Sequence, residues 1–479
     1  MTADFFRARL ETMIDLRHPL AVLASRMDWA GIEAGLAPLF ARSIRAGREV
    51  EDCDLFGPAL QVAGAGTSAA GRPRLPIRLM VSLLYLKHAF NESDESVCAR
   101  WAENVVWQFF SGMTYYEPRL PCDATQLGRF RRILGEAGVE ELLSRTLTTA
   151  VGMKAVTVAE LEVVVVDTTV QEKAVAYPTD SRLLEVSRAK IALLAKRAGL
   201  ELKQTYAKEG KSLRRRAGGY AHANQFKRLH RVLKRQRTIL GRLLRDVQRG
   251  MKTLPADAQA RLCVWLERAE RIRTQRRHDK DKLYALHAPE VECIGKGKAR
   301  QPYEFGVKVG IAIGIDCGLI VGARSFAGHP YDGHTLGEQM EQSTIVLQDV
   351  GAKPHTVYAD LGYRGGDEAI TPVKLIHRGK YKSLTGAQRE LLKRRQAVEP
   401  VIGHLKQDHR MRRCWLKGSD GDALNAVLCA AGYNLRWLLR AIMRLGLGSF
   451  FVRLLLVKCW AKWSTQIGQR APSRAAVMV

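Results

Sequence analysis

The chain of 479 residues lacks several features that mark common classes of protein. It has no Cys-x-x-Cys pair, and its nine cysteines are widely spread, so we interpret them as reduced thiols and not as disulfides or zinc ligands. It also has no clean apolar run of about 20 residues. The most lipid-like stretch, 447–460, contains Arg453 and Lys458, which predicts an amphipathic or packed helix and no membrane span. The N-terminus has no apolar segment of signal-peptide length, so we expect a cytoplasmic protein.

Acidic residues are scarce as well, because the chain has 48 Asp and Glu against 76 Lys and Arg, with a net charge of +28. A hydrophobic share of 46% excludes a largely disordered chain, and the length predicts about three domains. The charge excess indicates a polyanionic partner, with nucleic acid a better candidate than acidic lipid. We predict no small-molecule cofactor, because no helix follows the glycines of 306–314 as a dinucleotide-binding loop requires.

The positive charge is concentrated in residues 182–300, which have a helical pattern and contain 32 Lys and Arg but only 11 Asp and Glu. A single basic run is more typical of a solvated helix face, whereas an excess this local favours contact with a phosphate backbone. The residues predicted to bind nucleic acid here are Arg214, Arg215, Arg216, Lys227, Arg228, Arg231, Lys234 and Arg235.

Residues 1–70 are predicted to form a helical N-terminal arm, and residues 71–153 a domain of short helices. The third of these helices carries Arg129, Arg131 and Arg132 on the side expected to be exposed, which is compatible with a helix-turn-helix DNA-binding domain in which Arg129 and Arg132 contact DNA. An ordinary helical bundle is at least as good an interpretation of this segment.

The remainder reads as an α/β domain, residues 154–181 and 301–445, interrupted by the basic helical segment 182–300 and followed by a C-terminal helix and tail, 446–479. Its expected strands are 162–170, 303–315, 319–325 and 356–360, and its expected helices are 336–347 and 388–411. Asp332 and His334 are predicted to cap the first of these helices.

Three acidic residues of this domain stand out. Asp167 follows four valines at the end of their apolar run, and Asp360 ends a short apolar strand before a glycine-rich loop, so both acids are expected at strand ends. Each alone is better explained as a hydrogen-bonded or capping aspartate, but ligands collect at the carboxyl ends of strands in open sheets. Glu399 shares a helix face with Arg395 and Lys406, which suits a structural salt bridge or a metal carboxylate beside phosphate-binding cations. Three carboxylates together suit two Mg²⁺ or Mn²⁺ ions and phosphoryl transfer.

Six motifs, in this order and spacing, resemble the DDE transposases of bacterial insertion sequences, in the four/five superfamily and most like family five. The motifs are 166–170, 289–298, 303–309, 328–336, 358–365 and 395–406, within a likeness that extends from about Arg72 to Leu439. The resemblance implies an RNase H-like catalytic core, an N-terminal DNA-binding domain, and metal-dependent cutting and joining of DNA at the ends of a mobile element.

By this resemblance Asp167, Asp360 and Glu399 are the catalytic residues and the ligands of two Mg²⁺ or Mn²⁺ ions, while Arg395 and Lys406 contact DNA phosphate. The predicted partners are the terminal inverted repeats and the target DNA, bound by a homodimer or higher oligomer in the bacterial cytoplasm, with the nucleoid. The sequence leaves two alternatives open: an RNase H-like nuclease or resolvase that cuts without joining, and a basic nucleic-acid-binding protein without activity.

Overall fold

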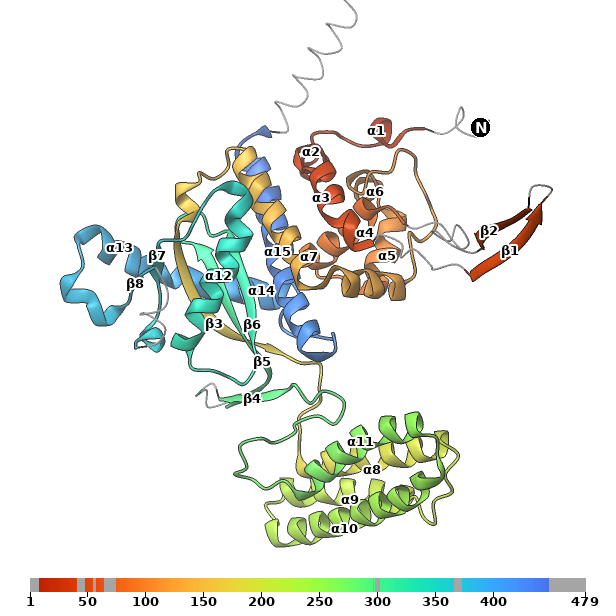
Figure 1. Ribbon diagram of the computed structural model, residues 1–479. Coiled ribbons are helices and arrows are strands. Elements are labelled where there is room, and N and C mark those ends of the chain that lie inside the picture. The colour runs from red at the N-terminus through yellow and green to blue at the C-terminus, as the bar shows by residue number, and fades with distance from the viewer. Residues whose placement is uncertain are drawn as a thin grey trace, which may run out of the picture.

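The computed structural model describes residues 8–40, 48–54, 57–63, 75–295, 297, 302–365 and 373–447. At its centre is a mixed sheet in which the strands follow the order β4-β5-β3-β7-β8, while β6 also pairs with β5 (Figure 1). β4, β5 and β6 run antiparallel to their partners, whereas β7 and β8 run parallel to β3. The bounds are β3 (Val163–Glu172), β4 (Glu292–Gly295), β5 (Tyr303–Gly314), β6 (Ile320–Phe326), β7 (Thr356–Tyr358) and β8 (Lys374–Ile376).

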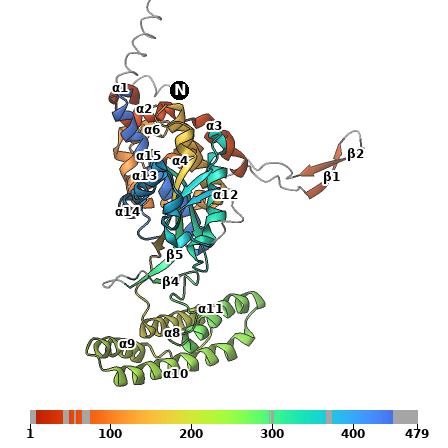
Figure 2. The same cartoon turned by 90° about the vertical axis from the view of Figure 1, so that its left-hand side faces the viewer.

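The central strand β3 forms from a run of β-branched residues. Val164, Val165 and Val166 are all fully buried, because helices cover both faces of the sheet. One face carries α12 (Leu336–Leu347) and the other carries α14 (Val398–Asp408) and α15 (Gly418–Arg444), as Figures 1 and 2 show. The sheet is therefore the middle layer of an α/β unit, as the sequence predicts.

The N-terminal helices share one hydrophobic core with this unit. The longest of them, α7, contains a break at Gly135, where a φ of 61° requires the left-handed backbone that glycine adopts without strain. α15 packs against α2, α4 and α7 as well as against β6, so it joins the helical part to the sheet. The helices are α1 (Leu10–Met13), α2 (Pro19–Arg26), α3 (Trp29–Leu36), α4 (Ile77–Ala89), α5 (Asp94–Glu103), α6 (Val105–Phe110) and α7 (Ala124–Gly152).

The basic segment is a separate helical bundle. The chain leaves the sheet after β3, forms four helices, and returns at β4, so the bundle extends beyond one end of the sheet (Figures 1 and 2). Its own apolar core includes Leu184, Leu240 and Leu266. The helices are α8 (Asp180–Arg197), α9 (Ala207–His222), α10 (Phe226–Gly250) and α11 (Ala256–Thr274).

Two predicted helical segments are wrong in part. The arm predicted as helical contains an antiparallel hairpin, β1 (Arg48–Asp54) and β2 (Gly57–Ala63). The helix predicted at 388–411 is instead α13 (Gly386–Arg394), a 3₁₀ turn (Arg395–Ala397) and α14. Pro400 explains the second break, because proline lacks an N–H and is accommodated in the first turn of a new helix.

Two further expectations also fail. Asp167 does not end its strand, since β3 continues to Glu172. Arg131 is buried and not exposed, because its Nη2 lies 2.8 Å from both carboxylate oxygens of Asp94. Within the described ranges, no helix is both long and apolar enough to cross a membrane. The C-terminal segment 448–479, including most of the lipid-like stretch, lies outside the described residues.

Candidate active site

The register of the central strands places Asp167 and Asp360 next to each other. β3 and β7 pair in parallel, and the last pair joins Val165 to Tyr358. Each aspartate lies two residues beyond this pair, so both follow it on neighbouring segments of backbone. Asp167 is half-buried in β3, whereas Asp360 is exposed and directly precedes the 3₁₀ turn Leu361–Tyr363. Two residues nearly two hundred positions apart in the chain thus lie near each other, on neighbouring backbone segments of the sheet.

The charges around Asp167 show that several carboxylates converge here. Burial raises the pKa of Asp167 above its ordinary value, and the negative charges of Asp360 and Asp332 raise it further. The Thr168 backbone N–H, which donates to Asp167 Oδ1 over 2.8 Å, and the positive charge of Arg395 lower the pKa of Asp167 only in part. A bound cation would relieve the remaining repulsion among these carboxylates.

The same aspartates also affect the pKa of a buried tyrosine, Tyr363. Burial raises the pKa of Tyr363 well above its ordinary value, and the negative charges of Asp167, Asp332 and Asp360 raise it further. The Tyr363 side chain therefore lies among three aspartates that come from β3, from the loop before α12, and from the end of β7.

Arg395 is the cation that faces this cluster. It sits in the 3₁₀ turn between α13 and α14, and it is buried, with 7% of its surface exposed. Its Nη2 lies 3.9 Å from Asp360 Oδ1. A buried guanidinium is costly unless charges or ligands surround it, so its place here fits a site that handles anions beside the carboxylates.

Glu399 follows Arg395 by one helical turn, as the second residue of α14. α14 packs against β3 through a buried face that includes Val398 and Leu405, but Glu399 itself is exposed. Among the residues that the structure describes, no three His, Cys, Asp or Glu side chains lie close enough together to hold a metal ion. The structure therefore brings Asp167 and Asp360 together and places Glu399 on an adjacent helix without joining it to them.

The two aspartates fit a Mg²⁺ site even so. Mg²⁺ usually takes one or two protein carboxylates and fills its other positions with water and substrate phosphates. Asp167 and Asp360 supply hard oxygen ligands whose mutual repulsion a cation would relieve. Asp360 is exposed and so accessible to a substrate.

Asp332 belongs to the site, although the sequence predicts it as a helix cap. That prediction is wrong, because neither the 3₁₀ turn Asp332–Thr335 nor α12 has a side-chain cap. Its Oδ1 accepts instead from Thr168 Oγ1 over 2.9 Å and from Lys308 Nζ over 2.8 Å. The only sequence signal was its position inside the 328–336 motif.

Lys406 lies further along α14. Its Nζ is 3.9 Å from Glu304 Oε2 on β5, and its side chain is mostly buried. Within α14, residues 399 and 406 are seven positions apart and so share a helix face. A 3₁₀ turn separates Arg395 from that helix, so the unbroken helix predicted to carry all three residues is interrupted between Arg395 and Glu399.

Comparison with known proteins assigns two segments of the chain. Residues 51–132 match a family described as Transposase domain (DUF772), and residues 371–439 match a family described as Transposase DDE domain. The chain belongs to the DDE transposase family. The second match contains Arg395, Glu399 and Lys406, whereas Asp167 and Asp360 lie outside both matched segments.

A relative of this transposase is known from Rhizobium meliloti, under the name uncharacterized protein ORF8 in nfe locus. It is 37% identical over 223 residues, which cover 47% of the transposase chain and 95% of the relative. No solved structure matches the chain significantly.

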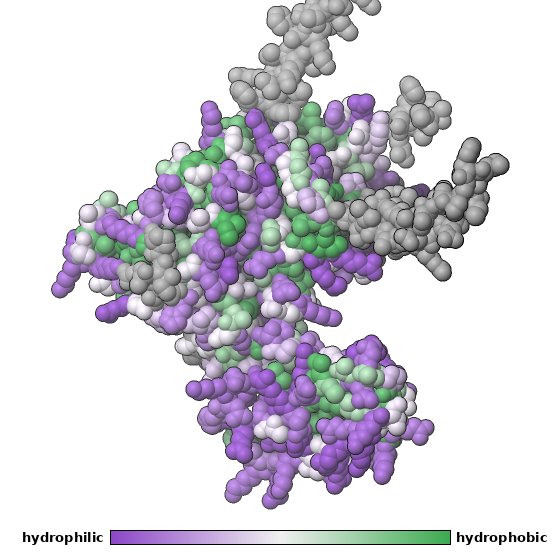
Figure 3. All heavy atoms as spheres, in the orientation of Figure 1, coloured by the Kyte–Doolittle hydropathy of each residue, from purple (hydrophilic) through white to green (hydrophobic). Residues whose placement is uncertain are grey.

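The basic residues of the transposase that were predicted to bind DNA are mostly exposed. Figure 3 shows a largely hydrophilic surface over the α8–α11 bundle. Arg235 differs, because its Nε donates to Glu209 Oε1 over 2.7 Å and its charge is therefore already partnered. The exposed residues are Arg214, Arg215, Arg216, Lys227, Arg228, Arg231 and Lys234 in the bundle, and Arg129 and Arg132 on α7.

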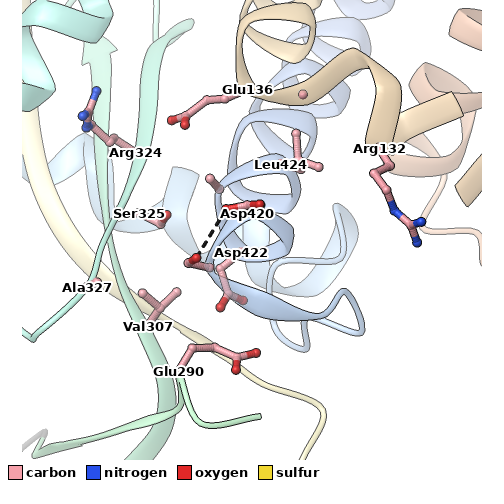
Figure 4. Close-up of a pocket in the computed structure, with 13 residues that line it drawn as sticks. Arg132, Glu136, Glu290, Val307, Arg324, Ser325, Ala327, Asp420, Asp422 and Leu424 are labelled. Atoms are coloured by element: carbon pink, nitrogen blue, oxygen red, sulfur yellow. Dashed lines mark hydrogen bonds between the residues drawn. The ribbon is translucent and has the colours of Figure 1, made fainter. Parts of the chain in front are cut away.

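One further pocket of the transposase, of about 360 Å³, lies between α7, the sheet and the start of α15 (Figure 4). It contains none of the predicted catalytic residues. Its charged lining consists of four carboxylates and two guanidinium groups, a balance that does not suit a phosphate backbone: Glu136, Glu290, Asp420, Asp422, Arg132 and Arg324.

Proposed function

We propose that this transposase cuts DNA at the ends of an insertion sequence and joins the freed 3′ ends to target DNA in a metal-dependent reaction. The observation that carries the proposal is that Asp167 and Asp360 each lie two residues beyond the last pair of the adjacent parallel strands β3 and β7, with the buried Arg395 3.9 Å from Asp360. Carboxylates and a guanidinium in one place are the groups that a phosphoryl transfer requires.

The proposal assigns two Mg²⁺ or Mn²⁺ ions to Asp167 and Asp360, with Glu399 as the third carboxylate. When bound, such ions supply the activation of the attacking oxygen and the stabilisation of the leaving oxygen. Arg395 would orient a DNA phosphate at this edge, because its planar guanidinium binds phosphate oxygens in pairs. Lys406 would contact the same strand further along α14.

An RNase H-like core remains part of the proposal. Three antiparallel strands and two parallel ones, arranged around the strand that carries the first aspartate, support it. The basic bundle is inserted between β3 and β4, whereas β7, which precedes Asp360, pairs with the other side of β3.

We further propose that the α8–α11 bundle and the N-terminal helices provide most of the DNA affinity. The exposed cations of α9 and α10 form the densest positive region among the described residues, and such a region binds DNA without sequence readout. Joining two element ends to a target favours a homodimer or larger assembly, which acts in the bacterial cytoplasm on nucleoid DNA.

The test uses the full chain, a duplex with the terminal inverted repeats that flank its gene, and Mg²⁺ or Mn²⁺. We expect strand cleavage and then joining to a labelled target. D167N, D360N and E399Q should each abolish cleavage and leave DNA binding within about twofold, because they remove ligands but no DNA-contacting cation. E390Q, on the neighbouring helix α13, is the matched control for E399Q and should cleave normally, because Glu390 is exposed and, among the described residues, pairs only with Lys393.

Each outcome decides between the candidate functions. Cleavage without joining would leave an RNase H-like nuclease or resolvase. DNA binding without metal-dependent cleavage would leave a non-enzymatic binding protein. Normal cleavage by E399Q would remove Glu399 from the site while retaining the two aspartates.

A further inference from the structure

We propose that Asp332 is a positioning residue that holds the two aspartate-bearing segments at a fixed separation, with Lys308 as its counterion. The inference rests on the proposed function, because the separation matters only if Asp167 and Asp360 act together. It assigns a role to the loop between β6 and α12, which the matched family segments do not cover.

Asp332 is linked directly to the Asp167 segment. Its Oδ1 accepts a hydrogen bond of 2.9 Å from the hydroxyl of Thr168, the residue that follows Asp167 in β3. The Thr168 backbone N–H meanwhile donates to Asp167 Oδ1 over 2.8 Å. One residue thus connects the carboxylate of Asp332 to the carboxylate of Asp167.

The same loop contacts the Asp360 segment. The second oxygen of Asp332 lies close to Gly362, since a Cβ built on that glycine would be 3.1 Å from Oδ2. The neighbouring Tyr331 donates its hydroxyl to the Arg364 carbonyl over 3.2 Å. Both contacts fall on the turn that directly follows Asp360, so the loop bridges the two sides of the site.

Lys308 fixes this bridge to the sheet. It is buried on β5, and its Nζ donates to Asp332 Oδ1 over 2.8 Å and to the Pro330 carbonyl over 2.6 Å. The loop is held again at its start, where the Gly328 N–H donates to Glu292 on β4. A loop anchored at both its start and its centre can hold Asp332 in one orientation.

These contacts favour positioning over direct metal binding. Asp332 Oδ1 is shared by a hydroxyl and an ammonium group, which occupy it, and Oδ2 faces the Gly362 turn. Groups that orient ligands in this way commonly change metal affinity by about 10- to 100-fold when they are removed.

The experiment measures Mn²⁺ binding to the full-length protein by calorimetry without DNA, in addition to cleavage. We expect D332A to weaken Mn²⁺ binding by about 10- to 100-fold and D332N to restore part of this loss, because asparagine keeps an oxygen for Thr168 and Lys308. D349A is the matched control, because Asp349 is a partly exposed aspartate outside the site that faces Arg145, and it should bind Mn²⁺ like the wild type.

T168V is the second variant, and it keeps the proposal testable if D332A does not fold. It removes only the hydroxyl link and should weaken Mn²⁺ binding in the same direction but less strongly. Wild-type Mn²⁺ affinity in a folded D332A or in T168V, combined with lost binding in D167A, would overturn the positioning role and leave the proposed function intact. Unchanged binding in D167A and D360A would instead overturn the proposed function.

Discussion

The salt dependence of DNA binding is the most direct test of the basic bundle. Arg231, Lys234, Arg242 and Arg245 are exposed along α10. At 100° per residue they fall within an arc of about 80°, and at 1.5 Å per residue they extend over about 21 Å. None of them forms a salt bridge with another described residue, although Arg242 and Arg245 act electrostatically on Glu209 and Glu270, which pair more closely with Arg235 and Arg273. Their exposed charges can therefore contact a phosphate backbone.

We therefore expect the quadruple glutamine variant of these four residues to bind duplex DNA with a flatter salt dependence. Each lost phosphate contact reduces the slope of log K against log salt concentration by about 0.9, so the slope should fall by between 3 and 4, or about 3.6 if all four act. With a slope change of about 3.6, the difference in affinity should be about 4,000-fold near 0.1 M salt and should vanish near 1 M. Fluorescence anisotropy with a labelled duplex of unrelated sequence measures both quantities.

A second quadruple variant removes the same net charge from cations that are already partnered. These are Arg235 with Glu209, Arg249 with Asp246, Arg261 with Asp257, and Arg273 with Glu270. We expect this control to change the slope by less than about 1. Equal slopes in the two variants would show that total charge, and not the α10 face, determines binding; an unchanged slope in the first would remove α10 from the interface.

Two predictions concern stability. Lys173→Met should lower the free energy of unfolding by about 3 to 5 kcal/mol in urea titrations, because Lys173 Nζ lies 2.8 Å from Asp422 Oδ2 with both side chains buried, and a loss below about 1 kcal/mol would contradict this. Burial lowers the pKa of His409 to about 4. As the pH falls, the unfolded chain therefore protonates this imidazole before the folded protein does. The free energy of unfolding should consequently decline by about 3 kcal/mol between pH 6.5 and pH 4. His409→Asn should flatten this decline, whereas the control His222→Asn, at an exposed position, should not. An unchanged decline in His409→Asn would show that other groups cause the loss of stability.

The sequence predicts the sheet of this protein well and its helix breaks poorly. Strands β3, β5, β6 and β7 and helix α12 lie within a few residues of their predicted ranges. Runs of buried β-branched residues and periodic apolar residues are compatible with few other secondary structures. β8 (Lys374–Ile376) was missed because its three residues give no recognisable period, whereas the equally short β7 is marked by the acid and the glycine-rich loop that follow it. β4 (Glu292–Gly295) was also missed, since it lies within the segment 182–300 that was predicted to be helical. The break at Arg395–Ala397 depends on where a helix restarts before Pro400, which periodicity does not record.

The candidate site also contains residues that the sequence indicates and residues that it does not. The proximity of Asp167 and Asp360 could be anticipated, because an acid that follows a valine run or ends an apolar strand stands out in the sequence. The contacts of Asp332 could not, because they involve Thr168 and Lys308, which are 164 and 24 positions away in the chain. The prediction that Arg131 is exposed was wrong for the same reason, because its buried position depends on an ion pair with Asp94, 37 positions earlier in the chain.

The position of α15 has a consequence for synthesis of the protein. α15 is the last described helix, yet it packs against α2, α4, α7 and β6 and includes many of the most deeply buried side chains. A nascent chain that still lacks this helix would expose the apolar faces of both the early helices and the sheet, and such surfaces associate with one another. Ribosomes that stop before about residue 418 should therefore release chains that aggregate or are degraded, so that only nearly complete chains accumulate in folded form.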